Sequence, residues 1–308
     1  MKKINWAPVI IFTYNRPSLT KKLLNSLSKC DNFDKSKIII YSDKFKKYNS
    51  IDKKKVLEVR KELIKFKNKN KNVDIFFHKE NLGLFRNLIG GISKILKKYP
   101  RAIVVEDDLI LHKNFISYMN KSLSLYKNKK NALQVSGYSY PIKYNSNRAY
   151  FLNITSCWGW GTWSDRWREF LEFTQDKTLI NKIYKKINSN LKIKNEFNIQ
   201  GSYDYLKLLK KQIDTNFNSW GVLFYLFSFK KKYLNLFPPY NLVQNKGFDG
   251  SGVHKSTSDI FSKKTLSNIS NVIFYPKSLK KNNFILKKIS LFLKKELNII
   301  NRIIHSFL

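Results

Sequence analysis

Three consecutive acidic residues, Glu106, Asp107 and Asp108, directly follow an apolar run at residues 102–105. Adjacent carboxylates repel one another unless a cation or hydrogen-bond donors neutralise them. Hard divalent cations such as Mn²⁺ or Mg²⁺ prefer carboxylate oxygen and keep positions open for phosphate oxygens. We therefore expect a divalent-metal site here, which would stabilise a diphosphate as a leaving group. The alternative is a solvated acidic turn that caps the next element.

A second polar group stands where the apolar run at residues 8–13 gives way to a loop. Thr13 and Asn15 offer small polar side chains and backbone amides that can hold a base and a phosphate. Arg16 adds a planar guanidinium, which binds phosphate oxygens in pairs. We expect these residues to bind a phosphorylated donor. The alternative is an ordinary turn before Pro17.

Asp43 and Arg86 are two further candidates for donor binding. Asp43 follows the apolar run at residues 37–42, and an ionised acceptor there can take the N3–H of a uracil ring. Arg86 lies in a polar turn that enters a helix, where the helix dipole also favours a diphosphate. The alternatives are a helix cap or turn residue at Asp43 and a solvated surface position at Arg86.

Four of the six tryptophans lie within residues 158–167. Indole rings stack on the apolar faces of sugars, and their N–H groups donate to hydroxyls. We therefore expect Trp158, Trp160 and Trp163 to contact a sugar or an acceptor, and the glycines between them would let the backbone approach a ligand. The alternative is a small core beneath the sheet.

A glycine-rich loop at residues 247–252 is predicted to close over the donor. His254 follows this loop, and imidazole is a common ligand of Mn²⁺-like ions. We expect His254 to be a second metal ligand. The alternative is a histidine that binds no metal, which is the more frequent role of a single histidine.

Short apolar runs alternate with amphipathic stretches over the first half of the chain. The runs predict strands at residues 8–13, 37–42, 73–77, 102–105 and 133–136, and the stretches between them predict helices, among them 51–67 and 84–99. Such alternation is typical of an α/β fold with a mainly parallel sheet, whose strands all end at one edge. Ligands bind at that edge, so residues 13–16, 43 and 106–108 should converge there.

The second half is less regular and ends in a basic tail. We expect several helices over about 178–231 and a short strand near 233–237, which complete one α/β domain at residues 1–260. In residues 275–308, apolar residues such as Ile285, Ile289 and Leu293 recur at helical spacing, with lysines on the other face. This pattern predicts an amphipathic helix that lies on an anionic bilayer. The alternative is a helix docked on the protein's own core.

Composition narrows the possible partners and compartment. The 308 residues carry a formal charge of +38, which favours an anionic partner: nucleic acid, a phosphorylated substrate or an acidic membrane. Cys30 and Cys157 lie far apart in the sequence and indicate reduced thiols in a cytosolic protein. No stretch approaches the ~18 apolar residues of a spanning helix. We therefore expect a cytoplasmic protein, peripheral on the inner face of the cytoplasmic membrane.

With these residues in place, the chain resembles the GT-A superfamily of glycosyltransferases. Within it, the pattern is similar to bacterial family-2-like transferases of surface polysaccharides and to the N-acetylglucosaminyltransferase I family. The resemblance spans roughly residues 7–255 and rests on the acidic block after its strand, the two earlier strand ends, the tryptophan block and residues 239–254. It implies a Rossmann-like GT-A fold.

The resemblance also implies a role for each matching residue. Asp108 would coordinate manganese, Asp107 would contact the donor ribose or phosphate region, and Glu106 would contact the transferred sugar. Asp43 would bind the base. Arg16 and Arg86 would lie near the diphosphate.

One position departs from the family pattern. Inverting members place an aspartate before a Ser-Trp or Asp-Trp pair, as the base that deprotonates the acceptor hydroxyl. Here Asn218 precedes Ser219-Trp220, and an amide cannot accept that proton. Three explanations stay open: Asp214 or Asp204 substitutes, the alignment is shifted by several residues, or activity is weak or absent.

The resemblance implies an inverting, metal-dependent hexosyltransferase. It would move a sugar from a nucleoside-diphosphate sugar, with UDP as the expected nucleotide, to a membrane-associated or lipid-linked glycan in bacterial surface polysaccharide synthesis. The alternatives are a catalytically silent partner subunit and a basic nucleic-acid-binding protein. However, no nucleic-acid-binding motif is visible in the sequence, and we do not expect nucleic acid to be a partner. A nucleotidyltransferase would need a glycine-rich loop near the first strand, and residues 1–32 contain no glycine.

Overall fold

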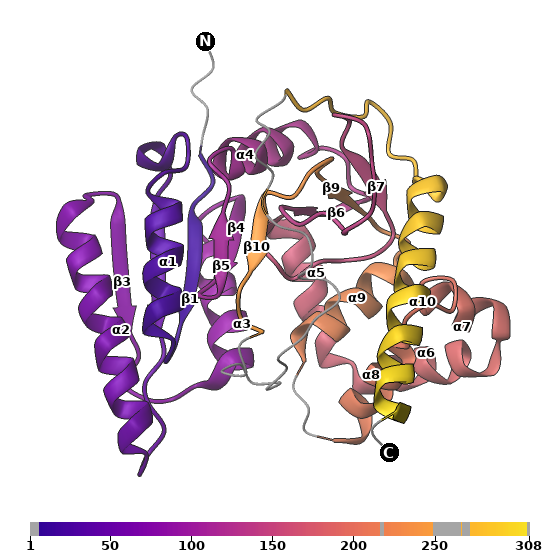
Figure 1. Cartoon of the computed structure of the whole chain (residues 1–308), viewed down its shortest axis with the longest axis horizontal. Helices are drawn as coiled ribbons and strands as arrows, with labels where there is room; N and C mark the ends of the chain where they lie inside the picture. The colour runs from indigo at the N-terminus through magenta and orange to yellow at the C-terminus, as the bar shows by residue number, and fades with distance from the viewer. Residues whose placement is uncertain (1–5, 216–218, 249–265, 267–271, 307–308) are drawn as a thin grey trace.

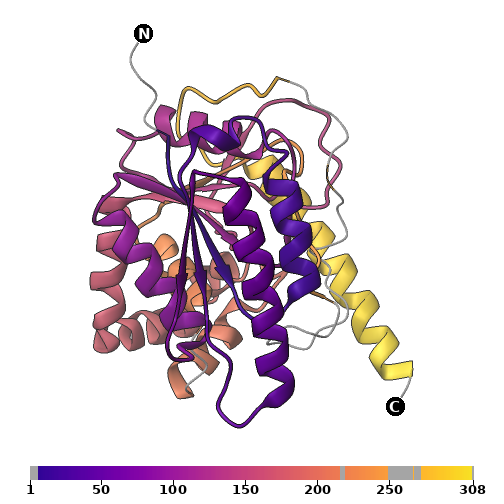
Figure 2. The same ribbon diagram turned by 90° about the vertical axis from the view of Figure 1, so that its left-hand side faces the viewer.

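The computed structural model describes residues 6–215, 219–248, 266 and 272–306. Within them, eight strands form one sheet in the order β3-β2-β1-β4-β8-β6-β9-β7. Helices cover both faces of this sheet, with α1 and α2 on one side and α3 on the other (Figure 2). The sheet is mixed, but its first half is wholly parallel, as expected of an α/β fold.

The first half follows the predicted alternation of strands and helices. Its elements are β1 (Val9–Thr13), α1 (Pro17–Leu27), β2 (Ile38–Ser42), α2 (Ser50–Lys69), β3 (Val73–Phe77), α3 (Gly83–Leu96) and β4 (Arg101–Glu106). β1 and β2 are buried along their whole length, which is why their sequences are continuous apolar runs rather than alternating ones. The five strands predicted from these runs are all present, the fifth being β6 (Ala132–Ser136).

The second half adds further strands beyond β4, of which β8 and β7 run antiparallel to their neighbours (Figure 1). Its strands are β7 (Tyr150–Leu152), β8 (Trp160–Trp163) and β9 (Leu234–Phe237), and its helices are α4 (Phe115–Leu125), α5 (Ser164–Gln175), α6 (Lys177–Ser189), α7 (Leu191–Phe197), α8 (Tyr205–Asp214) and α9 (Trp220–Lys230). β8 lies between β4 and β6 and runs antiparallel to both. β8 was not expected, because its sequence, Trp-Gly-Thr-Trp, lacks the apolar run that is typical of a buried strand.

A two-stranded ribbon holds the residues that follow β10 beside the residues that follow β4. β5 (Leu109–Leu111) pairs antiparallel with β10 (Val243–Asn245), and Asn245 is the register partner of Leu109. Asp108 immediately precedes β5, so this register sets residues 246 and 247 beside it. Segments 132 to 136 residues apart in the sequence are thereby held together by main-chain hydrogen bonds.

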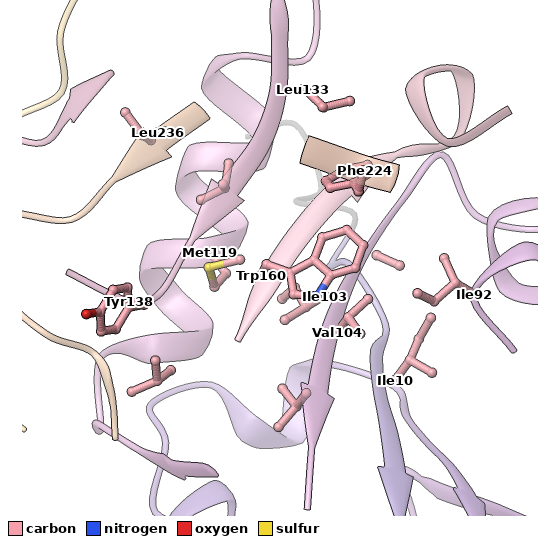
Figure 3. Packing of buried hydrophobic residues seen from close by; sticks show 14 of the residues in the cluster. Ile10, Ile92, Ile103, Val104, Met119, Leu133, Tyr138, Trp160, Phe224 and Leu236 are labelled. Atoms are coloured by element: carbon pink, nitrogen blue, oxygen red, sulfur yellow. The ribbon is translucent and has the colours of Figure 1, made fainter. Parts of the chain in front are cut away.

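The centre of the core is aromatic. Trp160 is fully buried, and its ring stacks on Trp220 with a centroid distance of 5.2 Å and lies 5.3 Å from the ring of Phe224. Figure 3 shows Trp160 among aliphatic side chains of β4, including Val104. This packing joins β8 and α9 to the parallel half of the sheet.

The C-terminal helix α10 (Asn283–Ser306) packs on the body with its first half. Ile285, Ile289 and Leu293 are each fully buried, so the face predicted to lie on a bilayer is docked on the protein's own core. The expected helix is confirmed, but these three residues pack on the protein's own core, which is the alternative to contact with a bilayer. No helix in the described part of the chain combines the length and low polarity that a membrane crossing requires.

Candidate functional site

Three strand ends meet at one edge of the sheet, as the sequence predicts. Phe12 is the register partner of Glu106, and Thr13 is the partner of Ser42. The residues that follow these strands therefore leave the sheet side by side. Within the described residues, the buried hydroxyls of Thr13 and Ser42 have no hydrogen-bond partner. Thr13 as a donor-binding residue stays a prediction.

Arg16 joins the two aspartates that follow β4. Its Nη2 lies 2.5 Å from Asp107 Oδ1, and its Nη1 lies 3.0 Å from Asp108 Oδ2. The Tyr14 backbone N–H also donates to Asp107 Oδ2, at 3.0 Å. Burial lowers the pKa of Arg16, but Asp107 and Asp108 outweigh this effect and raise it overall. The loop after β1 thus places a fixed positive charge against the acidic block.

Glu106 and Asp107 hold their protons more tightly than ordinary carboxyl groups. Burial, followed by the neighbouring Asp108 carboxylate, raises the pKa of Glu106 to about 8. Burial also raises the pKa of Asp107, to about 6, although the guanidinium of Arg16 opposes the rise. The single guanidinium neutralises only part of the negative charge of three adjacent acids, so the cluster favours binding of a further cation or of protons.

Lys246 and Gly247, which follow β10, lie against Asp108. The Lys246 backbone N–H donates to the Asp108 backbone carbonyl at 2.8 Å. A Cβ placed on Gly247 would overlap Asp108 Oδ2 and lie 3.0 Å from Arg16 Nη1. Only glycine therefore fits at this position without displacing the ion pair.

The donor set fits a hard divalent cation that shares its coordination sphere with a ligand. The Asp108 side chain is 13% exposed, whereas that of Asp107 is 3% exposed. The described residues contain no group of three or more histidine, cysteine or acidic side chains arranged to hold a metal ion by themselves. Mg²⁺ and Mn²⁺ are often held by one or two carboxylates, with phosphate oxygens and water as the remaining ligands. Asp108 is the residue best placed for this role.

Asn15 faces a different partner from the one expected. Its Nδ2 donates to Asp52 Oδ1 at 2.6 Å, and the Lys46 backbone N–H donates to Asp52 Oδ2 at 2.7 Å. The hydroxyl of Tyr14 donates to the same carboxylate. Sequence reasoning missed Asp52, whose only signal is an acidic residue three positions after Asn49, the residue that caps α2.

The Asp43 carboxylate is satisfied by backbone donors. It accepts hydrogen bonds from the N–H groups of Lys44, Leu82 and Gly83, each at 2.9 Å, and the residue is only 3% exposed. Asp43 thus acts as a turn residue that fixes the loop before α3, which is the alternative considered for it. Arg86 lies exposed in the first turn of α3. Contacts of Asp43 with a base and of Arg86 with a diphosphate stay predictions.

The tryptophan block divides into core and surface residues. Trp160 is fully buried, and Trp163 is 3% exposed with its Nε1 donating to the Leu123 carbonyl at 3.0 Å. Neither ring has a free face, so both belong to the core and neither can stack on a sugar in this arrangement. Trp158 is half-buried and packs edge-on against Tyr138 and Phe248. Of the three predicted stacking residues, Trp158 is half-buried, whereas Trp160 and Trp163 are buried.

The start of α9 packs against Cys157, whose thiol senses the charge of Glu106. A Cβ on Gly221 would lie 2.8 Å from Cys157 Sγ, and burial followed by the charge of Glu106 raises the pKa of the Cys157 thiol. The position predicted for the catalytic base immediately precedes this helix. However, Asn218 itself and the predicted metal ligand His254 lie outside the described residues.

The proposed substitutes for Asn218 have structural roles elsewhere. Asp214 is half-exposed at the end of α8 and pairs with Lys210 at 2.5 Å. Asp204 caps the same helix by accepting from the Lys207 N–H at 3.1 Å. No contact in the described part of the chain joins Asp214 to Asp107 or Asp108, and its catalytic role stays a prediction.

No protein-family profile matches the chain, and no curated protein sequence matches it. Among solved structures, it is similar to S. aureus TarS, with TM-score 0.31 and 18% identity over 42% of this chain and 34% of that one. It is also similar to the mannosyltransferase PcManGT from Pyrobaculum calidifontis, solved with GDP-Man and Mn²⁺, with TM-score 0.36 and 12% identity over 56% of this chain and 49% of that one.

A third similar structure is a UDP-glucose pyrophosphorylase complexed with UDP-glucose, with TM-score 0.34 and 8% identity over 76% of this chain and 91% of that one. The chain is similar to parts of these structures, and it spans half or less of the length of the TarS 1–349 and PcManGT chains. Because every TM-score is below 0.5, the function is inferred from the residues of the site.

Proposed function

We propose that the protein is a metal-dependent glycosyltransferase that uses a nucleoside-diphosphate sugar, with UDP as the nucleotide. The arrangement of Arg16 against Asp107 and Asp108 carries this proposal. It sets a guanidinium and a partly exposed carboxylate beside one another at the edge where α/β sheets bind ligands. A metal ion and a cationic side chain in the same place can together neutralise the charge of a diphosphate.

In the proposed reaction, an acceptor hydroxyl attacks the anomeric carbon of the donor sugar. The bond from that carbon to the diphosphate oxygen breaks, and the hydroxyl proton passes to a base. A divalent ion held by Asp108 would neutralise charge on the departing diphosphate. Arg16 binds a phosphate oxygen, the Tyr14 N–H fixes the orientation of Asp107, and Glu106 faces the transferred sugar.

Hexosyl transfer with inversion to a lipid-linked or membrane-associated glycan in bacterial surface polysaccharide synthesis belongs to the same proposal. The site residues at the strand ends and the positively charged surface support it, because lipid-linked acceptors reside at anionic membranes. On this proposal the protein works on the inner face of the cytoplasmic membrane.

A thermal-shift screen of the full chain tests the donor and the metal together. A UDP-sugar should raise the melting temperature more with Mn²⁺ than without it, because a ligand that binds the folded state stabilises that state. Asp108→Asn should lose the Mn²⁺-dependent part of the shift. Asp34→Asn, a change at an exposed acid on the short 3₁₀ helix after α1, should retain it. Equal shifts in both variants would refute metal binding by Asp108.

A silent partner subunit is the second candidate, because Asn218 stands at the position of the family's base. Donor hydrolysis and sugar transfer should be measured for the wild type, Asn218→Asp and Asp214→Asn. If only Asn218→Asp transfers sugar, the natural chain is the silent subunit. Loss of transfer in Asp214→Asn would instead identify Asp214 as the substitute base.

A further inference from the structure

The exposed face of α10 forms a continuous basic and apolar stripe. Phe284 and Leu291 are 64% and 58% exposed. Three exposed lysines share their face at helical spacing: Lys287, Lys294 and Lys295. No acidic residue occurs in the sequence between Phe284 and Lys295. We call these five residues the α10 stripe.

The body of the protein fixes the orientation of this stripe. Ile285, Ile289 and Leu293 are fully buried on the opposite face of the helix, so α10 cannot roll without exposing them. Rotation of the helix would move these apolar side chains into water, which is unfavourable. The apolar face of α10 thus packs on the protein's own core, and the lysine face remains accessible to a partner.

From this geometry we propose that the α10 stripe is the surface by which the protein docks on an anionic lipid bilayer. The inference deepens the proposed function, on which the membrane location rests, by naming the face that contacts the lipid. Lysine ammonium groups pair with anionic headgroups, and an exposed phenylalanine and leucine can enter the interface between headgroups and acyl chains.

Two features distinguish the α10 stripe from general surface charge. The ammonium of Lys288 lies 4.6 Å from the ring centroid of Phe284, and its Nζ donates to the Lys143 carbonyl at 3.2 Å. These contacts hold a large exposed aromatic ring at the helix start, where it would otherwise be costly to solvate. The comparable surface of α2 also exposes Leu57 and Ile64, but it is interrupted by acidic residues at positions 58 and 62.

Vesicle co-sedimentation of the full chain tests the proposal. The vesicles are phosphatidylcholine with or without phosphatidylglycerol, and the wild type should pellet only with the anionic ones. The triple change Lys287→Glu, Lys294→Glu and Lys295→Glu should weaken binding by at least about a hundredfold, because each lysine near such a surface contributes about 1 kcal/mol. A double change, Phe284→Ser with Leu291→Ser, should weaken it by about tenfold or more.

Matched controls lie on α2. Lys54→Glu, Lys55→Glu and Lys61→Glu change the net charge by the same amount at exposed positions, and Leu57→Ser with Ile64→Ser matches the apolar change. These controls should bind anionic vesicles like the wild type. Circular dichroism melts check that all variants fold.

Three outcomes would overturn the proposal. The first is equal loss in the α10 and α2 triple variants, which would show an effect of total charge alone. The second is that the wild type does not pellet with anionic vesicles. The third is that the wild type binds a single-stranded RNA more tightly than it binds the vesicles, and that the α10 changes abolish both kinds of binding. The UDP-sugar thermal shift is measured in the same samples, so failure of membrane docking is distinguishable from failure of the proposed transferase activity.

Discussion

Asp52 Oδ1 accepts a hydrogen bond from Asn15 Nδ2 at 2.6 Å, and through it α2 holds the loop that carries Arg16. The same carboxylate accepts from the hydroxyl of Tyr14, whose backbone N–H binds Asp107. Burial raises the pKa of Asp52, but these hydrogen bonds outweigh it and lower the pKa overall. An ionised acid on α2 therefore sets the position of the residues that contact the acidic block.

Replacing Asp52 should weaken donor binding without removing any group that contacts the donor. Asp52→Ala leaves buried donors unpaired, each at a cost of about 1–3 kcal/mol, so the melting temperature should fall. Because Arg16 would lose its fixed position, KM for the nucleotide sugar should rise by about tenfold or more, with a smaller change in kcat. Steady-state kinetics at saturating metal give both values.

Two comparisons separate positioning from general destabilisation. Asp52→Asn keeps an acceptor for Asn15 or Tyr14 and should recover part of the KM effect. Glu58→Gln changes an exposed acid on the same helix and should leave kinetics and stability unchanged. If Asp52→Ala melts at a lower temperature but retains the wild-type KM, Asp52 serves stability alone.

Gly247→Ala should impair metal-dependent activity more than any other glycine-to-alanine change in the described loops. The added Cβ would overlap Asp108 Oδ2, so either the carboxylate or the loop must move. We expect a loss of at least about tenfold in kcat/KM and a higher Mn²⁺ concentration for half-maximal activity. Gly90→Ala, on α3 with nothing within 4 Å of its Cβ, is the matched control and should be neutral or slightly stabilising.

The parallel half of the fold could be predicted because β1, β2 and β4 are largely apolar runs followed by polar residues. Thr13, Asp43 and Glu106 all stand at such boundaries, and strand register then brings them to one edge. The prediction needed only local periodicity and the rule that parallel strands end together.

Other features depend on contacts between distant segments, which no local pattern encodes. Trp160 resembles a ligand-binding residue in sequence, and only the pairing of β8 between β4 and β6 shows that its ring is enclosed. Asp52 lies on a helix whose spacing indicates only a solvated surface, yet its side chain meets Asn15 37 positions earlier. Likewise, only tertiary packing shows that the apolar face of α10 lies on the protein's own core rather than on a bilayer.

The raised pKa values of Glu106 and Asp107 predict that the metal-free protein loses stability as pH rises. A carboxyl group that binds its proton more tightly when folded stabilises the folded state at low pH, and this contribution is lost above the ordinary pKa. The loss should run from about pH 4 to 6 for Asp107 and from about pH 4.5 to 8 for Glu106. Urea unfolding at a series of pH values without divalent metal measures it.

Glu106→Gln removes the higher of these two transitions and should flatten the profile between about pH 6 and 8. Added Mn²⁺ should stabilise the wild type more at pH 8 than at pH 6, because the ion competes with protons for the carboxylates. A metal-free wild type whose stability is independent of pH over this range would contradict the proton-binding state assigned to Glu106.

Arg16→Gln should destabilise the metal-free protein and make it more dependent on divalent metal. Removing the guanidinium leaves Asp107 and Asp108 adjacent without their neutralising partner, at a cost of about 3 kcal/mol for a largely buried pair. Mn²⁺ should restore more stability to Arg16→Gln than to the wild type, because the ion then supplies charge that Arg16 no longer provides. Arg16→Lys retains the charge but cannot contact both aspartates in the same planar geometry, so it should fall between the two. If Mn²⁺ stabilises Arg16→Gln no more than the wild type, Arg16 and the ion do not neutralise the same carboxylates.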